Sequence, residues 1–325
     1  QKLKQKVYNW QTGFSWIFNY TKKMKKNILI ITGGGITHLE SFEKFGAEFG
    51  VLITIASFSK VSYVTEGQMV EIFIDDKPLK NFDLIYYRLI GKARETSAVL
   101  VDYITSHNIK IIDSCQSRSL LFPMTQSKAC EMRLLYDANI PIPKTFFGNL
   151  NKIKENGAKT LGFPFVLKRT DGKRSNAVWS PKTEIDLDLL IQDLLIEQKQ
   201  GKRFLAQEFI KGSQRLRVLI IGDKPIACIT RGTRWRRRFV KKVDGKIPDK
   251  ISGVIDPIPE NVAELAVRAS KAIGLEIAGV DILVEDETQK LFVLEVNSAP
   301  RWYSITRDTG ISVEREIIKY LASLI

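Results

Sequence analysis

Three oxygen-bearing side chains interrupt two apolar runs near the end of the chain. Asp281 lies within GVDILV, Glu295 lies within KLFVLEV, and Asn297 follows the second run, with the polar segment EDETQ between the runs. This pattern predicts a β-hairpin. Glu295 and Asn297 are two residues apart and should share a face, with Asp281 folded back beside them. A set of Asp, Glu and Asn oxygens suits a hard cation, and Mg²⁺ bound together with ATP phosphates is the natural candidate.

The same stretch carries a family resemblance. GVDIL followed by LEVNSAP resembles the metal-binding end of the ATP-grasp superfamily, in its RimK-like (ribosomal-protein glutamate ligase-like) branch. The resemblance covers residues 119–325 and extends more loosely back to residue 26. It implies an ATP-grasp fold, α/β and α+β, with an N-terminal α/β pre-ATP-grasp domain. It also implies that Asp281, Glu295 and Asn297 hold Mg²⁺, with two ions expected and Mn²⁺ as an alternative. The competing interpretation is the solvated face of an ordinary hairpin.

Lysines in two predicted elements and one loop match the phosphate contacts of that family. Lys128 lies in the helix-like stretch MTQSKACEMRLLYDANI, and Lys168 ends the strand-like run FPFVLK. The resemblance implies that both bind ATP phosphates, whereas the alternative for Lys128 is a solvent-facing helix position. The lid loop after Gly172 departs from the family pattern. It is basic, contains Lys173, and lacks the usual further glycines that let backbone N–H groups approach phosphates.

The run FLAQEFI (204–210) matches the hinge that holds adenine in the family, largely through backbone groups. The resemblance therefore implies four nucleotide-binding positions: Gln207, Glu208, Phe209 and Ile210. The alternative is an edge strand with one exposed glutamate. Residues 216–230 then read as a hairpin that turns at GDKP.

Two arginines open that hairpin. Family members often carry Asp-x-Arg there. Arg217 matches the arginine of that motif, but Arg215 stands where the acidic residue is usual. The acidic residue helps to bind the nucleotide in the family, and the resemblance does not extend to that ribose contact here.

A basic segment, RGTRWRRRFVKKVDGK (231–246), follows the hairpin. The resemblance implies a loop whose arginine meets the phosphate or acyl phosphate, with Arg236 as the first match and Arg231 as the second. We predict a loop that orders when acidic substrate and ATP are bound. Two alternatives are a solvated loop and an RNA-binding element in which arginines and aromatic residues contact phosphates and bases.

The segment before residue 119 alternates as an α/β domain does. NILIIT (27–32) precedes Gly33, Gly34 and Gly35, which lack the dinucleotide-binding spacing and are interpreted as a tight turn. Further runs predict strands at 51–56, 82–89 and 109–113 and helices at 38–49 and 93–105. Residues 1–23 are expected to be an extension before a natural start at Met24. The expected domains are 24–118 (pre-ATP-grasp), 119–203 (linker helix and central subdomain) and 204–325 (C-terminal subdomain with the metal site).

Composition bounds the remaining possibilities. The 325 residues are 44% hydrophobic, enough for a sizeable core in two or three subdomains. The chain lacks the long apolar run of a membrane span, and its three widely spaced cysteines fit no metal or disulfide framework, so we expect a cytoplasmic protein. The net charge of +14 indicates an anionic partner, which is a nucleotide, an acidic peptide or nucleic acid.

Together with the resemblance, these features predict an ATP-dependent carboxylate–amine ligase. ATP would phosphorylate a carboxylate, and an amine would attack the acyl phosphate to form an amide or peptide bond. The basic residues favour an acidic small-molecule or peptide substrate, and no membrane partner is expected. The alternative is a nucleotide-binding or RNA-binding ATP-grasp-like module without ligase activity. Arg215, the glycine-poor lid and the basic segment favour that alternative, whereas the intact set of metal ligands argues against it.

Overall fold

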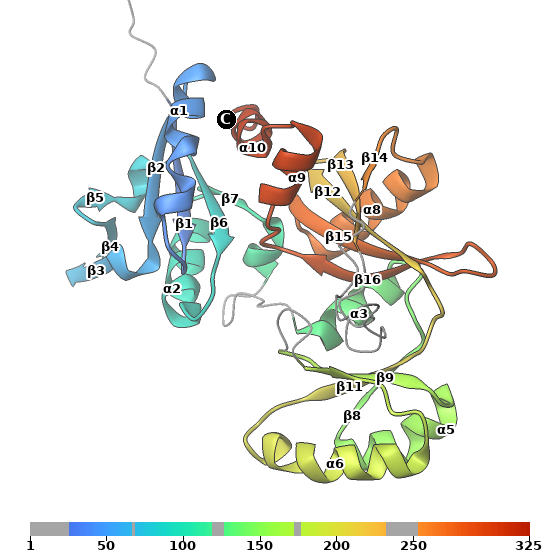
Figure 1. Ribbon diagram of the computed structural model, residues 1–325. Helices are drawn as coiled ribbons and strands as arrows, with labels where there is room; N and C mark the ends of the chain where they lie inside the picture. The colour runs from blue at the N-terminus through green and yellow to red at the C-terminus, as the bar shows by residue number, and fades with distance from the viewer. Residues whose placement is uncertain (1–25, 67–68, 119–126, 172–176, 232–252) are drawn as a thin grey trace, which may run out of the picture.

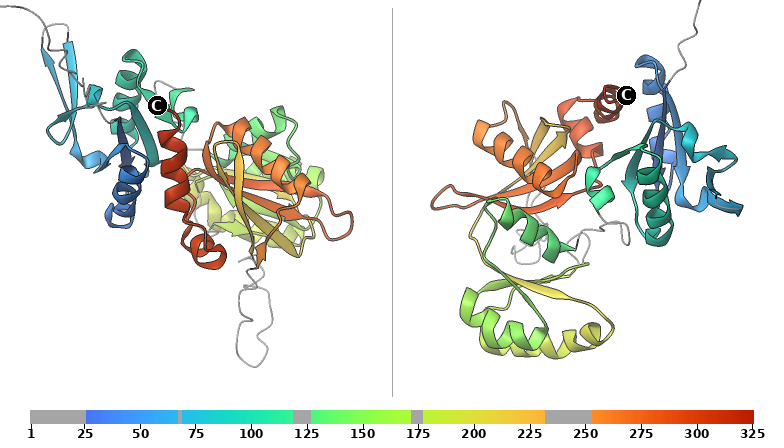
Figure 2. Two further views of the ribbon diagram at one scale, coloured as in Figure 1. Left: turned by 90° about the horizontal axis from the view of Figure 1, so that it is seen from above. Right: turned by 180° about the vertical axis from the view of Figure 1, so that it is seen from behind.

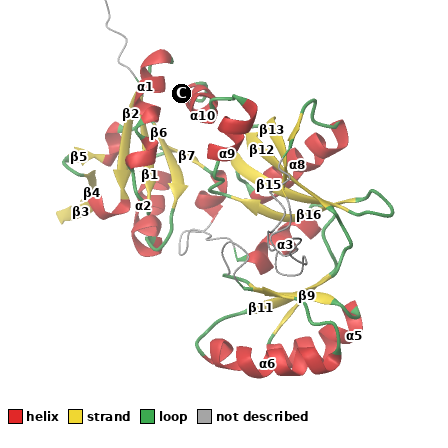
Figure 3. Ribbon diagram, viewed as in Figure 1, coloured by secondary structure: helices red, strands yellow, loops and turns green. Residues whose placement is uncertain are grey.

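The computed structural model of the chain describes residues 26–66, 69–118, 127–171, 177–231 and 253–325. Figure 1 shows three bodies that follow the chain: an N-terminal domain in blue and cyan, a central domain in green and yellow, and a C-terminal domain in orange and red. Helices and strands are mixed throughout (Figure 3). The expected extension, residues 1–23, lies outside the described residues, as does Met24.

A parallel sheet in the order β2-β1-β6-β7 forms the N-terminal domain. Its elements are β1 (Asn27–Thr32), β2 (Leu52–Ser57), β6 (Leu84–Leu89), β7 (Lys110–Ile112), α1 (Ser41–Glu48) and α2 (Arg94–Ser106). The apolar run of β1 is buried over its last five residues, as expected for a strand covered on both faces. The four strands and both helices are confirmed. At Gly33 the chain turns tightly: a Cβ there would lie 2.2 Å from the Ile90 carbonyl oxygen.

A second, antiparallel sheet lies within the same domain, and the sequence analysis made no prediction for it. It consists of β3 (Val61–Glu66), β4 (Met69–Ile74) and β5 (Lys77–Pro78). Figure 2 shows it at the end of the molecule away from the other two domains. Ile72 and Ile74 anchor it by packing into the core that also contains Phe58 and Tyr87.

The central domain places an antiparallel sheet against the long helix α6 (Glu184–Lys199) (Figure 1). Its sheet order is β10-β9-β11-β8, made of β8 (Thr145–Gly148), β9 (Phe165–Arg169), β10 (Val178–Trp179) and β11 (Phe204–Glu208). Helix α6 packs on it through Leu187, Ile191 and Leu194. Shorter helical pieces are α4 (Leu150–Lys152), the turn η5 (Ile153–Gly157) and α5 (Ala158–Leu161). Strand β11 belongs to this central sheet, whereas the next strand, β12 (Gln214–Ile221), belongs to the sheet of the C-terminal domain. The chain therefore passes from one sheet to the other between residues 208 and 214.

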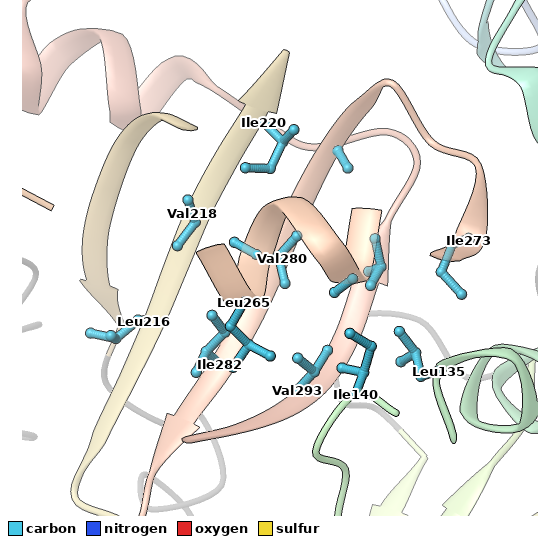
Figure 4. Close-up of a cluster of buried hydrophobic side chains, with 14 of the residues drawn as sticks. Leu135, Ile140, Leu216, Val218, Ile220, Leu265, Ile273, Val280, Ile282 and Val293 are labelled. Atoms are coloured by element: carbon cyan, nitrogen blue, oxygen red, sulfur yellow. The ribbon is translucent and has the colours of Figure 1, made fainter. Parts of the chain in front are cut away.

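The C-terminal domain is a five-stranded antiparallel sheet in the order β14-β13-β12-β15-β16. The strands are β12 (Gln214–Ile221), β13 (Lys224–Arg231), β14 (Val254–Ile255), β15 (Ile277–Val284) and β16 (Leu291–Asn297). One face packs against α8 (Glu260–Ile273), which ends at the left-handed Gly274. Figure 4 shows alternate residues of β12 and β15, such as Val218 and Val280, meeting Leu265 of that helix. Helix α3 (Lys128–Asp137) adds Leu135 to this core and confirms the predicted linker helix.

The opposite face of that sheet is divided. Leu219, Ile221 and Ile277 pack with α9 (Tyr303–Thr309), α10 (Val313–Ala322) and the N-terminal domain. Further along the same strands the side chains become charged, with Arg217 of β12 opposite Asp281 of β15. The remaining short helices are η1 (Thr37–Leu39), η2 (Phe58–Lys60), η3 (Leu79–Asn81) and η4 (Ser114–Arg118). Among the described residues, no helix is long and apolar enough to cross a membrane.

Candidate active site

The charged end of the five-stranded sheet contains a row of three facing residues. Arg217 of β12 is opposite Asp281 of β15, and Asp281 is opposite Glu295 of β16. Directly opposed residues in an antiparallel pair share a face. Asn297 lies two residues beyond Glu295, opposite Gly279. The hairpin register therefore brings the three predicted metal ligands to one surface, as the spacing in the sequence requires.

Asp281 is fully buried and holds two arginines. Its Oδ1 accepts from Nε of Arg217 at 2.5 Å, and its Oδ2 accepts from Nη2 of Arg217 at 2.6 Å and from Nη2 of Arg215. Burial alone would raise the pKa of this carboxyl, but the charges of Arg215 and Arg217 hold it well below its usual value. Arg217, predicted as a catalytic residue, thus anchors a buried carboxylate, and Arg215 shares that role.

Glu295 has a more open setting. Lys128 of α3 donates to its Oε1. The Glu295 side chain is 31% exposed and that of Lys128 is 19% exposed, whereas the Asp281 side chain has no exposed surface. A single flexible ammonium on a partly solvated carboxylate is readily displaced by a stronger charge. The helix lysine therefore faces the sheet and not the solvent.

Asn297 is the last residue of β16, and the loop that follows it packs closely on β15. Its Nδ2 donates to the Gly279 carbonyl at 3.1 Å, which leaves Oδ1 as the atom available to accept or to coordinate. A Cβ on Gly279 would lie 2.9 Å from Cβ of Pro300, so glycine is required for this approach. Arg88 of β6 donates to the Pro300 carbonyl at 2.9 Å, and its guanidinium lies 4.2 Å from the ring centre of Trp302. The N-terminal domain thus supports the loop that follows the predicted metal ligands.

Lys168 of β9 approaches the row from the central domain. Its Nζ donates to Oε1 of Gln207 at 2.5 Å. Gln207 is buried on β11, and its Nε2 donates to Oγ1 of Thr145 at 2.9 Å and contacts Sδ of Met132 at 3.2 Å. Burial, with the nearby charge of Lys128, lowers the pKa of Lys168 to about 8. Gln207, predicted to bind nucleotide, therefore positions Lys168 and connects β11 to α3.

Glu131 belongs to the same group and was missed by sequence reasoning. It lies one turn after Lys128 on α3, it is 3% exposed, and its Oε1 accepts from the backbone N–H of Val296 at 2.5 Å. Burial and the nearby Glu295 raise its pKa to about 8. Its only sequence signal is its spacing from Lys128, because a glutamate in a helix is ordinarily solvated.

The predicted adenine hinge lies at the end of β11. Oε1 of Glu208 accepts from the backbone N–H of Lys144 at 2.7 Å, and the Glu208 N–H donates to the Lys144 carbonyl at 2.9 Å. The exposed Phe209 and the half-buried Ile210 follow as the chain leaves the strand. The Glu208 side chain therefore fixes the predicted hinge to Lys144, the residue before β8, and nucleotide contacts at these positions remain a prediction.

Three other predicted residues cannot be placed in full. Lys173 and Arg236 lie outside the described residues, as does most of the predicted 231–246 loop. Arg231 is the last residue of β13, where its backbone is opposite Arg215. Their predicted roles are therefore untested.

Only two of the three predicted metal ligands have an oxygen that is open to a cation. Among residues 26–325 that the structure describes, no group of three or more His, Cys, Asp or Glu side chains could hold a metal ion. Asp281, Glu295 and Asn297 instead offer carboxylate and amide oxygens, which suit Mg²⁺. Glu295 and Asn297 fit such an ion, because each is only partly buried and has one side-chain oxygen that accepts no hydrogen bond within the described part of the chain. Asp281 does not fit in the same way, because its oxygens are taken by guanidinium groups.

Comparison with known proteins identifies the family. Residues 125–321 match the model of the RimK-like ATP-grasp domain. The chain belongs to the RimK-like ATP-grasp family. A protein of Shewanella baltica (strain OS155) named "Probable alpha-L-glutamate ligase 1" is 31% identical over 291 residues, which cover 88% of this chain and 90% of that protein. A "Probable alpha-L-glutamate ligase" of Trichodesmium erythraeum is 29% identical, with 87% and 90% covered.

Solved structures show the same fold. The ATP-grasp ligase PsnB in complex with its minimal precursor has a TM-score of 0.70 at 18% identity, covering 93% of this chain and all of that one. The RimK-like match begins just before Lys128 and extends into α10, so it includes every described residue of the charged row. The predicted family and fold are confirmed, and this RimK-like chain is an ATP-dependent ligase.

Proposed function

We propose that this ligase joins a carboxylate to an amine through an acyl phosphate, with glutamate or an acidic peptide among its substrates. One observation carries the proposal: Lys128 of α3 donates to Glu295, and Lys168 of β9 lies near enough to Lys128 and Glu295 for their charges to act on its pKa. Relatives named as glutamate ligases support the choice of glutamate. The chain's excess of basic residues is consistent with an acidic acceptor.

The lysines bind and orient ATP in this proposal. Phosphate oxygens replace Glu295 as the partner of Lys128 and replace Gln207 as the partner of Lys168, because a polyanion attracts an ammonium more strongly than one carboxylate or an amide does. Bound Mg²⁺ would screen the phosphate charge and help to align the γ-phosphoryl group. Glu295 and Asn297 would hold it. The binding of two ions and the use of Mn²⁺ as a substitute stay predictions.

Positive charge then stabilises the transfer. The γ-phosphoryl group moves to the substrate carboxylate, ADP leaves, and the amine displaces phosphate from the acyl phosphate. Lys128 and Lys168 offset the charge that develops on the phosphoryl oxygens. We retain Arg236 and Arg231 as predicted contacts of the phosphate or acyl phosphate, and Lys173 as a predicted lid contact. Nucleophilic catalysis by the enzyme is not needed, because the carboxylate itself attacks ATP.

As part of the same proposal, we divide the chain into the three domains expected from the sequence, residues 24–118, 119–203 and 204–325. We place nucleotide between the central domain and the C-terminal domain, with the N-terminal domain supporting the Pro300 loop.

The three cysteines, Cys115, Cys130 and Cys228, are thiols and not disulfides, which is consistent with the proposed cytoplasmic setting.

Product analysis tests the ligase proposal. The protein is incubated with Mg·ATP, glutamate and a pool of amines, amino acids and acidic peptides, and the products are measured by mass spectrometry. We expect one ADP and one phosphate for each amide formed, and a product heavier by one glutamate residue. Formation of AMP and pyrophosphate, or turnover of ATP without any amide product, would reject the proposal.

A further inference from the structure

The two carboxylates of the site differ in what they can still bind. Both oxygens of Asp281 are occupied by guanidinium groups, and its side chain has no exposed surface. Glu295 has one oxygen bonded to an ammonium and a side chain that is 31% exposed. The difference is therefore one of bonding as well as of burial.

Magnesium makes demands that Asp281 does not meet. The ion requires near-octahedral geometry at about 2.0–2.1 Å and usually keeps several of its waters. A fully buried carboxylate leaves no surface for those waters. An ion at Asp281 would also lie beside the cationic groups of Arg215 and Arg217, which would repel it. The half-buried Glu295 and Asn297 carry neither restriction.

Arg215 already supplies the positive charge that a cation would bring to this carboxylate. Its side chain is 20% exposed, and it bonds the oxygen of Asp281 that Arg217 also holds through Nη2. We propose that the Arg215 guanidinium takes the place of a second cation, so that this site binds ATP with one Mg²⁺, held by Glu295 and Asn297. The inference rests on the proposed function, because it assumes that ATP binds at this row.

A charged side chain is always present, whereas the occupancy of a bound ion depends on the metal concentration. Arg215 is positively charged at every physiological pH and metal concentration. The metal content of the nucleotide complex should therefore saturate in one step. Replacing Arg215 by aspartate would free Asp281 from one guanidinium and would add a carboxylate beside it, which together would create the conditions for a second ion.

Counting bound metal tests this inference without relying on turnover. Mn²⁺ serves as the spectroscopic probe, and equilibrium dialysis with a non-hydrolysable ATP analogue gives the ratio of bound Mn²⁺ to bound nucleotide. We expect a ratio of one for the wild-type protein and two for Arg215→Asp. Arg215→Gln, which removes the charge without adding an acid, should also exceed one. It serves as the second variant if Arg215→Asp fails to fold.

The controls separate the possible failures. Arg268→Asp changes charge by the same amount on α8, where the arginine donates to the Asn139 carbonyl, and should keep a ratio of one. A wild-type ratio of two, or a ratio of one in both Arg215 variants with nucleotide still bound, would overturn the one-ion inference alone. Loss of all nucleotide binding in the wild-type protein would instead reject the proposed function, and the inference with it.

Discussion

Asp281 and Glu295 face each other across β15 and β16, yet their surroundings have almost nothing in common. Asp281 is closed off by Arg215 and Arg217 from the next strand, whereas Glu295 meets one lysine from a helix. Two guanidinium groups fix a buried charge in place, and one ammonium on a partly solvated charge is exchangeable. We therefore assign Asp281 to the framework of the site and Glu295 to the binding of metal and nucleotide.

The largest expected effect comes from neutralising the buried carboxylate. Asp281→Asn would leave two guanidinium groups around a neutral amide, and we expect the free energy of unfolding to fall by about 3–5 kcal/mol. Urea denaturation measures this change. In an Arg215→Gln background the same substitution should cost less, because one of the stranded charges is gone. A loss below about 0.5 kcal/mol in the wild-type background would show that Asp281 is not the anchor that we describe.

Neutralising the other carboxylate should spare the fold and damage the chemistry. We expect Glu295→Gln to reduce turnover roughly 100-fold or more, since it removes charge from the proposed metal position without changing shape. The free energy of unfolding should change by no more than about 1 kcal/mol. Turnover is followed by ADP release. Glu287→Gln, at an 80%-exposed position in the same hairpin, is the matched control and should behave as wild type. Equal turnover in both variants would remove Glu295 from the site.

A smaller effect is expected at the lysine of the central domain. Lys168→Met removes a point charge from the proposed phosphate position, and we expect the Kd for ATP to rise about 10-fold or more, because a charged hydrogen bond contributes roughly 1.5–3 kcal/mol. Calorimetric titration with an ATP analogue gives the Kd. Lys152→Met, which loses an exposed ion pair with Glu155 in the same domain, should leave it unchanged. An unaltered Kd in Lys168→Met would place the phosphates elsewhere.

The smallest effect, taken over one pH unit, concerns protonation of Glu131. Its pKa is about 8 in the folded protein against an ordinary value of 4.5. A carboxyl group with a raised pKa stabilises the fold at low pH, and that contribution is lost as pH rises from about 4.5 to about 8. Relative to Glu131→Gln, the wild-type protein should lose at most about 1.4 kcal/mol per pH unit in this interval. Unfolding curves at three pH values test this, and parallel pH profiles for the two proteins would contradict it.

The pairing of Asp281 with Glu295 follows from local pattern, and the pairing of Asp281 with Arg215 does not. A hairpin with period-two alternation leaves little freedom, so the GVDILV and KLFVLEV runs were enough to predict which side chains share a face. From the sequence, Arg215 could be recognised only as a departure from the Asp-x-Arg motif of the family. Its partner is 66 residues away, and the contact depends on which strands become neighbours in the sheet.

The sequence also did not show which charged and polar side chains are buried. Glu131 sits in a helix whose polar residues look solvated, and only the packing of α3 on β16 shows that its carboxyl meets Val296. Gln207 was predicted from a strand motif, but its role in holding Lys168 depends on the register of β9 and β11. Local patterns thus predicted the elements, whereas tertiary contacts decided the roles.

Transfer of labelled oxygen tests the central claim most directly. Glutamate labelled with ¹⁸O in its carboxylates is incubated with the protein, Mg·ATP and an amine acceptor, and the released phosphate is analysed by mass spectrometry. If the chain is a ligase that forms an acyl phosphate, each amide bond should transfer one ¹⁸O atom from the carboxylate to phosphate. Amide formation with unlabelled phosphate would contradict the acyl phosphate, and ATP consumption without amide or label transfer would contradict the ligase assignment itself.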